Sequence, residues 1–205
     1  MEKLTTLLSP AVPLPAENMD TDRIIPARFL KATTRNGMGT NLFSDLRFGI
    51  NKEPKPDFVL NNPVYSGSIL LAGKNFGCGS SREHAVWALK DYGFRVVVSE
   101  NFADIFRNNA LNSGLLPVEL SKESMKYLFQ VCQDNPSALF EVNVQEQVFK
   151  ECDTSFKTAF HIPAWKKQCL LMGLDDIDYL LSMKPEILKY ENTSLFHHLA
   201  NEIPW

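Results

Sequence analysis

The sequence predicts an α/β fold in a single domain, 1–205, because short apolar runs alternate with segments of helical periodicity that end at glycine. Residues 68–72 form an apolar run that predicts a buried strand, and a glycine-rich loop follows it. Residues 82–92 then place apolar side chains at helical spacing, and residues 96–98 are a run of valine. This order of strand, loop, helix and strand indicates a βαβ unit.

The regions on both sides of this unit have weaker but readable patterns. Residues 10–28 contain four prolines, which predict a fixed extended loop rather than a helix. Downstream periodicity and β-propensity predict two helices, at 102–112 and 123–133. The same patterns predict three strands, at 115–120, 138–144 and 147–150.

Two further stretches differ from the rest of the chain. Residues 32–57 are polar and rich in glycine and proline, and a loop of this length is usually functional or disordered. We expect it to be mobile in part in the isolated chain. The tail, about 164–205, is predicted to be helical over 164–172, 175–183 and 185–191, with Pro185 in the first position of the last helix.

The composition excludes several classes of protein. The net charge is −3, from 21 basic and 24 acidic residues, so no basic surface for nucleic acid is predicted. No apolar run approaches the roughly 20 residues that a membrane helix needs. Residues 1–5 lack the pattern of a signal peptide. The four cysteines have no C-x-x-C spacing, so we expect reduced thiols in a cytoplasmic protein and no metal site on this chain.

The loop after the first predicted strand has the composition of an anion-binding site. From 73 to 84 it reads Gly-Lys-Asn-Phe-Gly-Cys-Gly-Ser-Ser-Arg-Glu-His. Its three glycines allow positive φ and a close approach of the backbone to a ligand. The loop ends at a predicted helix start, where free N–H groups favour an anion. Arg82 adds a planar fork suited to a carboxylate or a phosphate.

Simpler structural interpretations compete with this one. Ser80 and Glu83 have the spacing of a capping box, which would make Ser80 a structural residue. That interpretation does not explain the glycines, nor a cation at Arg82 in the positive first turn of a helix. Cys78 is expected to be a loop residue, and His84 a structural hydrogen-bonding residue.

Nucleotide-binding motifs fit less well. A phosphate-binding P-loop needs Ser or Thr after Gly-Lys, where this chain has Asn75. A dinucleotide fingerprint needs a third glycine at the position of Arg82. Because Glu100 ends the next strand at about the distance of a ribose-binding acid, this alternative stays open.

Residues 77–85, Gly-Cys-Gly-Ser-Ser-Arg-Glu-His-Ala, closely resemble the signature of the mobile C-terminal domain of aconitases. Three more segments, 18–31, 102–118 and 173–178, resemble motifs of the small subunits of bacterial 3-isopropylmalate dehydratases, and the resemblance covers nearly the whole chain. It implies the aconitase-type swivelling β/β/α domain with a helical C-terminal tail, rather than a Rossmann sheet.

The resemblance also implies roles for four residues. Ser80 matches the serine that acts as an alkoxide base and removes a proton from carbon. Ser81 and Arg82 match residues that bind substrate oxygens, with Arg82 holding a carboxylate. Asp22 matches an active-site aspartate, although on its own it would be interpreted as a turn residue in a proline-rich loop.

The region expected to select the substrate departs from the aconitase pattern. Arg23 stands where aconitases have histidine, and their next substrate arginine has no secure match. Lys31 and Arg35 are candidates for that role. Phe29 and Leu30 are implied to lie near a pocket for an apolar branch of the substrate, whereas by composition alone they would be core residues.

The reaction implied by the resemblance needs a second chain. It interconverts 2-isopropylmalate and 3-isopropylmalate, both small dicarboxylates, by loss and return of water in leucine biosynthesis. The resemblance places a 4Fe-4S cluster on cysteines of a separate large subunit. Citraconate and homoaconitate-type acids stay open as substrates, because a pocket discriminates one methylene by only about 1–3 kcal/mol. An interaction protein of the same fold without a catalytic role also stays open.

Overall fold

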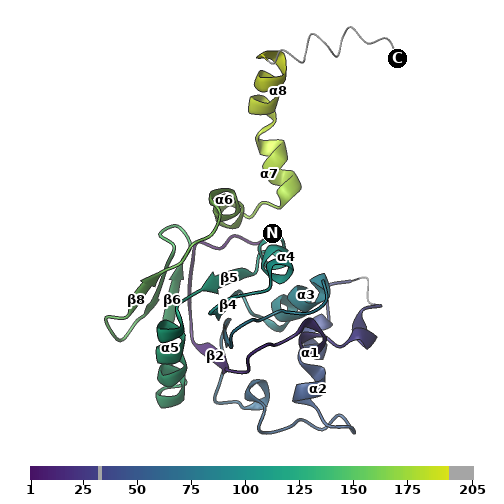
Figure 1. Cartoon of the computed structure of the whole chain (residues 1–205), viewed down its shortest axis with the longest axis vertical. Helices are drawn as coiled ribbons and strands as arrows, with labels where there is room; N and C mark the ends of the chain where they lie inside the picture. The colour runs from purple at the N-terminus through teal and green to yellow at the C-terminus, as the bar shows by residue number, and fades with distance from the viewer. Residues whose placement is uncertain (32–33, 194–205) are drawn as a thin grey trace.

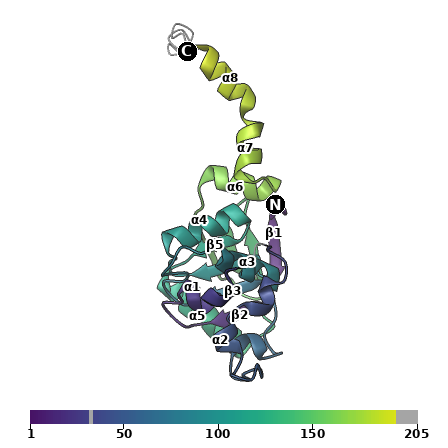
Figure 2. The same cartoon turned by 90° about the vertical axis from the view of Figure 1, so that its right-hand side faces the viewer.

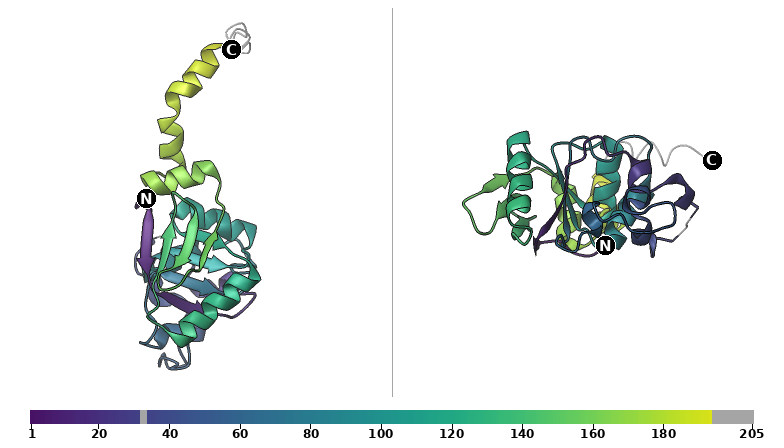
Figure 3. Two further views of the ribbon diagram at one scale, coloured as in Figure 1. Left: turned by 90° about the vertical axis from the view of Figure 1, so that its left-hand side faces the viewer. Right: turned by 90° about the horizontal axis from the view of Figure 1, so that it is seen from below.

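The computed structural model describes residues 1–31 and 34–193, which form a layered body and a projecting C-terminal arm (Figure 1). A parallel sheet lies at the centre of the body. Helices α3 and α4 cover one of its faces, and a second, antiparallel sheet and helix α5 cover the other (Figure 3). This is the β/β/α arrangement that the family resemblance implied.

The central sheet consists of four parallel strands in sequence order, each of them buried. They are β2 (Ala11–Leu14), β3 (Ile69–Ala72), β4 (Val96–Ser99) and β5 (Leu116–Glu119). Near-continuous apolar runs are typical of such strands, because both faces of the sheet are covered. Within the described chain, the strand order has no reversal, so the sheet lacks the switch-point crevice at which dinucleotides bind. The dinucleotide alternative is therefore wrong for this fold.

The prediction of a proline-rich loop over 10–28, rather than a helix, is wrong for residues 21–24 and 27–29, which form short helices. It is also wrong for residues 11–14, which form β2. The reason is the position of this strand at the edge of the sheet, where Pro13 removes no hydrogen bond that a neighbouring strand needs.

The βαβ unit and the helix after it are confirmed. Helix α3 (Glu83–Tyr92) joins β3 to β4, and α4 (Asp104–Ser113) joins β4 to β5. Gly93 and Gly114 end them with left-handed backbone conformations, φ 119° and 74°.

The antiparallel sheet is only partly predictable. Its order is β1-β6-β7-β8, and its strands are β1 (Thr6–Ser9), β6 (Phe140–Asn143), β7 (Val148–Glu151) and β8 (Lys157–Ala159). Strands β6 and β7 correspond to the predicted strands at 138–144 and 147–150, whereas no strand was predicted at β1 or β8. These are the two edge strands of the sheet, and they are short and largely exposed. Helix α5 (Lys122–Asp134) packs on β2 and β3 through Met125, Leu128 and Cys132.

The described part of segment 32–57 is not a plain loop. It contains a 3-10 helix (Met38–Asn41) and helix α2 (Ser44–Arg47), and Leu42 and Phe43 are fully buried. A Cβ atom on Gly39 would lie 2.5 Å from the backbone nitrogen of Tyr92, so this segment packs tightly on α3. Helix α1 (Thr21–Ile24) and two 3-10 helices (Ala27–Phe29 and Val59–Asn61) lie on either side of it in the sequence. The mobility of the segment stays a prediction.

Three helices follow the sheets: α6 (Ala164–Met172), α7 (Asp176–Ser182) and α8 (Lys184–Thr193). We call α7 and α8 the arm, because they extend away from the body (Figure 2) and contain no buried residue. Pro185 occupies the second position of α8, not the first as predicted. Residues 194–205 of the predicted tail lie outside the described residues.

Lys166 on α6 connects the arm to the body. Its side chain is 5% exposed and donates to Asp176 Oδ1 at 2.6 Å and to the side-chain oxygen of Asn112. Its ammonium also lies 3.9 Å from the centre of the Trp165 ring. A buried cation needs such partners, so Lys166 fixes the first turn of α7 on α4 and α6.

Candidate active site

The glycine-rich loop runs from the carboxyl end of β3 to the first turn of α3. Gly77 and Gly79 have positive φ angles of 76° and 86°. A Cβ atom on Gly77 would lie 2.2 Å from Phe106 Cγ, so only glycine fits between the loop and α4. The positive φ expected of the loop glycines is thus found at Gly77 and Gly79, and the close approach to a ligand stays a prediction.

Segment 18–22 lies against this loop although it comes much earlier in the chain. Gly77 N–H donates to the Met19 carbonyl at 2.8 Å, and Thr21 N–H donates to the Cys78 carbonyl at 2.9 Å. These two bonds resemble one step of a parallel ladder. The two segments with the resembling motifs are thus held together by main-chain hydrogen bonds.

Arg82 and Asp22 form an ion pair across this junction. The Nη1 atom of Arg82 donates to Oδ1 of Asp22, and the two residues are 60 positions apart in sequence. The Arg82 side chain is only 14% exposed, whereas Asp22 is 56% exposed. A partly buried guanidinium with a more exposed carboxylate partner can exchange that partner for another carboxylate. The structure therefore brings together two of the four residues expected in the site.

The capping-box interpretation of Ser80 is wrong. Helix α3 begins at Glu83, its N-cap residue is Arg82, and no side chain accepts a capping hydrogen bond there. The Glu83 carboxylate instead accepts from Trp87 Nε1 at 3.0 Å, one turn further along the helix. Ser80 and Ser81 are both exposed, so helix capping does not account for either serine.

Arg35, one of the two candidates for the second substrate-binding residue, is also near α3. The guanidinium of Arg35 lies 5.1 Å from the centre of the Trp87 ring, and its Nη2 atom is 3.7 Å from Oε1 of Glu83. Because Glu83 directly follows Arg82, Arg35 reaches the helix turn beside the ion pair. Lys31, the other candidate, is exposed. The ring of His84 packs on Trp87, 4.6 Å between centroids.

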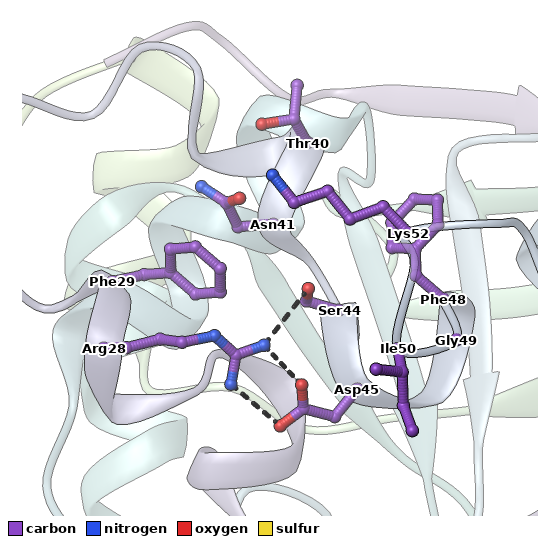
Figure 4. A pocket seen from close by; sticks show the side chains of 10 residues that line it. All are labelled: Arg28, Phe29, Thr40, Asn41, Ser44, Asp45, Phe48, Gly49, Ile50 and Lys52. Atoms are coloured by element: carbon purple, nitrogen blue, oxygen red, sulfur yellow. Dashed lines mark hydrogen bonds and ion pairs between the residues drawn. The ribbon is translucent and has the colours of Figure 1, made fainter.

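Phe29 and Leu30 are half-buried and pack against the core under α3. Phe29 also lines a pocket of about 660 Å³, in which Arg28 forms an ion pair with Asp45 (Figure 4). The hydrogen bond from Arg28 lowers the pKa of Asp45 below its usual value. The residues that line this pocket do not include Ser80, Ser81 or Arg82. Besides Arg28, Phe29 and Asp45, the lining residues are Thr40, Asn41, Ser44, Phe48, Gly49, Ile50 and Lys52. The candidate site residues of the glycine-rich loop therefore lie outside this pocket.

Two buried hydroxyl groups donate hydrogen bonds to carbonyl groups of the loop, and the sequence analysis predicted neither contact. The Thr21 hydroxyl donates to the Ser80 carbonyl at 2.8 Å, and the Ser99 hydroxyl donates to the Gly73 carbonyl at 2.8 Å. Thr21 lay in a recognised motif, and Ser99 followed a run of valine in a predicted strand. For Ser99, the only signal in the sequence was a polar residue at the end of a predicted buried strand.

The residues that the structure describes include no group of three or more histidine, cysteine or acidic side chains placed to hold a metal ion. All four cysteines are unpaired, and Cys132 and Cys169 are buried. Burial raises the pKa of the Cys132 thiol to about 12, which disfavours the thiolate that a metal would need. No described helix has the length and apolar character to cross a membrane.

Comparison with known proteins agrees with this fold and motif set. A model of the aconitase C-terminal domain family matches residues 1–123. A 3-isopropylmalate dehydratase small subunit of Cytophaga hutchinsonii is 56% identical over 196 residues, covering 96% of this chain and 98% of the relative. The small subunits of Karelsulcia muelleri and Christiangramia forsetii are 51% and 54% identical, covering 96% and 93% of this chain and 100% and 93% of their own lengths.

A solved structure adds evidence at the level of the fold. The crystal structure of 3-isopropylmalate dehydratase from Methanocaldococcus jannaschii superposes with a TM-score of 0.65 at 25% identity, covering 90% of this chain and 98% of that chain. The family model matches more than half of the chain, and the relatives match it nearly from end to end. The chain belongs to the aconitase C-terminal domain family, among the 3-isopropylmalate dehydratase small subunits.

Proposed function

We propose that this chain is the small subunit of a hydro-lyase that interconverts 2-isopropylmalate and 3-isopropylmalate in leucine biosynthesis. The observation that carries the proposal is the junction of the glycine-rich loop with segment 18–22. It sets a partly buried arginine, paired with a replaceable carboxylate partner, beside two exposed serines. Both substrates are dicarboxylates with one hydroxyl group, and an arginine fork suits one of those carboxylates.

In this proposal Ser80 is the base that removes the proton from carbon. A serine hydroxyl ionises far above neutral pH, so its alkoxide must be stabilised by nearby donors and positive charge. Arg82 and the loop N–H groups are the local sources of both. Arg82 then exchanges Asp22 for a substrate carboxylate, and Ser81 binds another substrate oxygen.

The proposed selection of substrate lies with residues 29–35. Both Arg35 and Lys31 are exposed, and Arg35 is the better candidate for a second carboxylate contact because it lies 3.7 Å from Glu83, beside Arg82. Phe29 and Leu30 would supply the apolar wall for the isopropyl branch.

The proposal includes a second subunit, which is supported by the exposure of the two serines. Ser80 and Ser81 are exposed, and water must be kept from an alkoxide base during proton transfer. We propose that a large subunit covers the loop and carries a 4Fe-4S cluster, which supplies the Lewis acid for the leaving hydroxyl. The described residues of this chain do not fit such a cluster. The four unpaired cysteines suit a reducing, cytoplasmic location.

The test is reconstitution with the cluster-bearing large subunit of the same organism. We expect no turnover from either subunit alone and turnover of 3-isopropylmalate from the pair. Arg82→Lys keeps the charge but loses the fork, so we expect kcat/KM to fall about 10²-fold with assembly intact. If no combination of subunits hydrates isopropylmaleate, the enzyme proposal fails and an interaction protein of the same fold remains.

A further inference from the structure

Thr21 is a buried polar residue that contacts the loop on both sides of Gly79. Thr21 is 2% exposed. Its N–H donates to the Cys78 carbonyl at 2.9 Å, and its hydroxyl donates to the Ser80 carbonyl at 2.8 Å. One residue of segment 18–22 therefore fixes two carbonyl groups of the glycine-rich loop.

Fixing a carbonyl also fixes the N–H group on the other side of the same peptide plane. The described peptide bonds are trans, so the C=O and N–H of one plane point in opposite directions. With the Ser80 carbonyl turned toward Thr21, the N–H of Ser81 points away from Thr21. The N–H of Gly79 does so for the same reason, because it shares its plane with the Cys78 carbonyl.

These two N–H groups are available to a ligand. Within residues 1–31 and 34–193, neither the N–H of Gly79 nor that of Ser81 has a hydrogen-bond acceptor. Gly79 is exposed and left-handed, φ 86°, and the nearest atom to a Cβ placed on it would be Asp20 Cβ at 3.4 Å. Backbone N–H groups that point outward from such a turn are suited to an oxyanion.

We propose that Thr21 is a positioning residue of the reaction: its hydroxyl orients the Ser80–Ser81 peptide so that the Ser81 N–H and the Ser80 side chain face the substrate. Thr21 itself stays buried beneath the loop and touches no substrate. This inference rests on the proposed function for its effect on turnover, but its structural part concerns the free chain alone.

The first test compares Thr21→Val with Thr21→Ser in the reconstituted enzyme. Valine has nearly the shape of threonine but cannot donate, so the Ser80 carbonyl loses its partner. We expect Thr21→Val to lower kcat about 10- to 100-fold with KM within about 2-fold, because a reacting group is misplaced while ground-state binding persists. Thr21→Ser retains the hydroxyl, and we expect it to restore kcat to within about 3-fold of the wild type.

Ser99→Ala is the matched control, because Ser99 is also buried and also donates a hydroxyl hydrogen bond to a loop carbonyl, that of Gly73. We expect it to lower the melting temperature as much as Thr21→Val does while leaving kcat nearly unchanged. Equal losses of kcat in both variants would mean that general loosening of the loop is responsible and would overturn the proposal. Unchanged kcat in Thr21→Val would overturn it directly.

A readout without turnover separates this inference from the proposed function. In the isolated chain, we expect the amide proton of Ser81 to change its NMR chemical shift in Thr21→Val and to stay in place in Ser99→Ala. An unchanged Ser81 amide in both variants would contradict the positioning role even if the enzyme is active. If the wild-type pair has no dehydratase activity but the amide shifts, only the proposed function fails.

Discussion

The glycine-rich loop and the arm are held in opposite ways. The loop presents exposed serines, yet its backbone is bonded to two distant parts of the chain, near residues 19–21 and 99–103. The arm has no buried side chain in its described helices, and its backbone hydrogen bonds are local. The difference indicates that the loop is organised before any partner binds. Helices of 7 and 10 residues, in contrast, are marginal in water without outside contacts.

The largest expected effect is at the loop and concerns chemistry rather than folding. Ser80→Ala should lower kcat of the reconstituted enzyme by about 10²- to 10⁴-fold, the range for loss of a general base. Stability should hardly change, because Ser80 is exposed. Steady-state kinetics and a thermal melt of the same preparation check both parts. Full turnover with normal assembly would show that another group removes the proton.

The next effect tests how firmly the loop is held. Gly77→Ala places a Cβ atom 2.2 Å from Phe106 Cγ at a positive φ, so we expect the free energy of unfolding to fall by about 3 kcal/mol. Gly37→Ala is the control, since Gly37 has a φ of 84° but no atom within 4 Å of the added Cβ. In that variant the free energy of unfolding should fall by only about 1–2 kcal/mol, which is the cost of a side chain in the left-handed conformation. If urea denaturation gives the same loss of unfolding free energy for Gly77→Ala and Gly37→Ala, Phe106 moves aside without an energetic cost.

This contrast also separates what sequence could predict from what it could not. Helices α3, α4 and α5 have local periodicity, α3 and α4 end at glycine, and strands β3 to β5 are short, largely apolar runs, so these local patterns were sufficient. Strand β1 pairs Thr6 with Asn143, and no local pattern encodes a partner so far away in the chain. In the site, Ser80 and Arg82 could be predicted as functional residues from their residue types and their place in the glycine-rich loop. The role of Thr21 could not be predicted, because it depends on which carbonyl its hydroxyl meets after folding.

A smaller effect is expected where the arm joins the body. Lys166→Met keeps the aliphatic stem but removes the ammonium that bonds Asn112 and Asp176. We expect a loss of about 1–2 kcal/mol in the free energy of unfolding, together with faster hydrogen exchange in the first turn of α7. Lys189→Met, on the exposed surface of α8, should leave both quantities unchanged. Unaltered exchange in α7 would show that Lys166 does not fix the arm.

The smallest expected effect is within the arm itself. Leu181 on α7 is 63% exposed, so Leu181→Ala should change the free energy of unfolding of the isolated chain by less than about 0.5 kcal/mol. Leu128→Ala on α5 makes the same change at a fully buried position and should cost about 2–5 kcal/mol. A loss near 1 kcal/mol or more at Leu181 would mean that the arm is covered in solution. If that loss grew with protein concentration, a second copy of the chain would bind the arm. The arm would then be held by contacts outside itself, as the loop is.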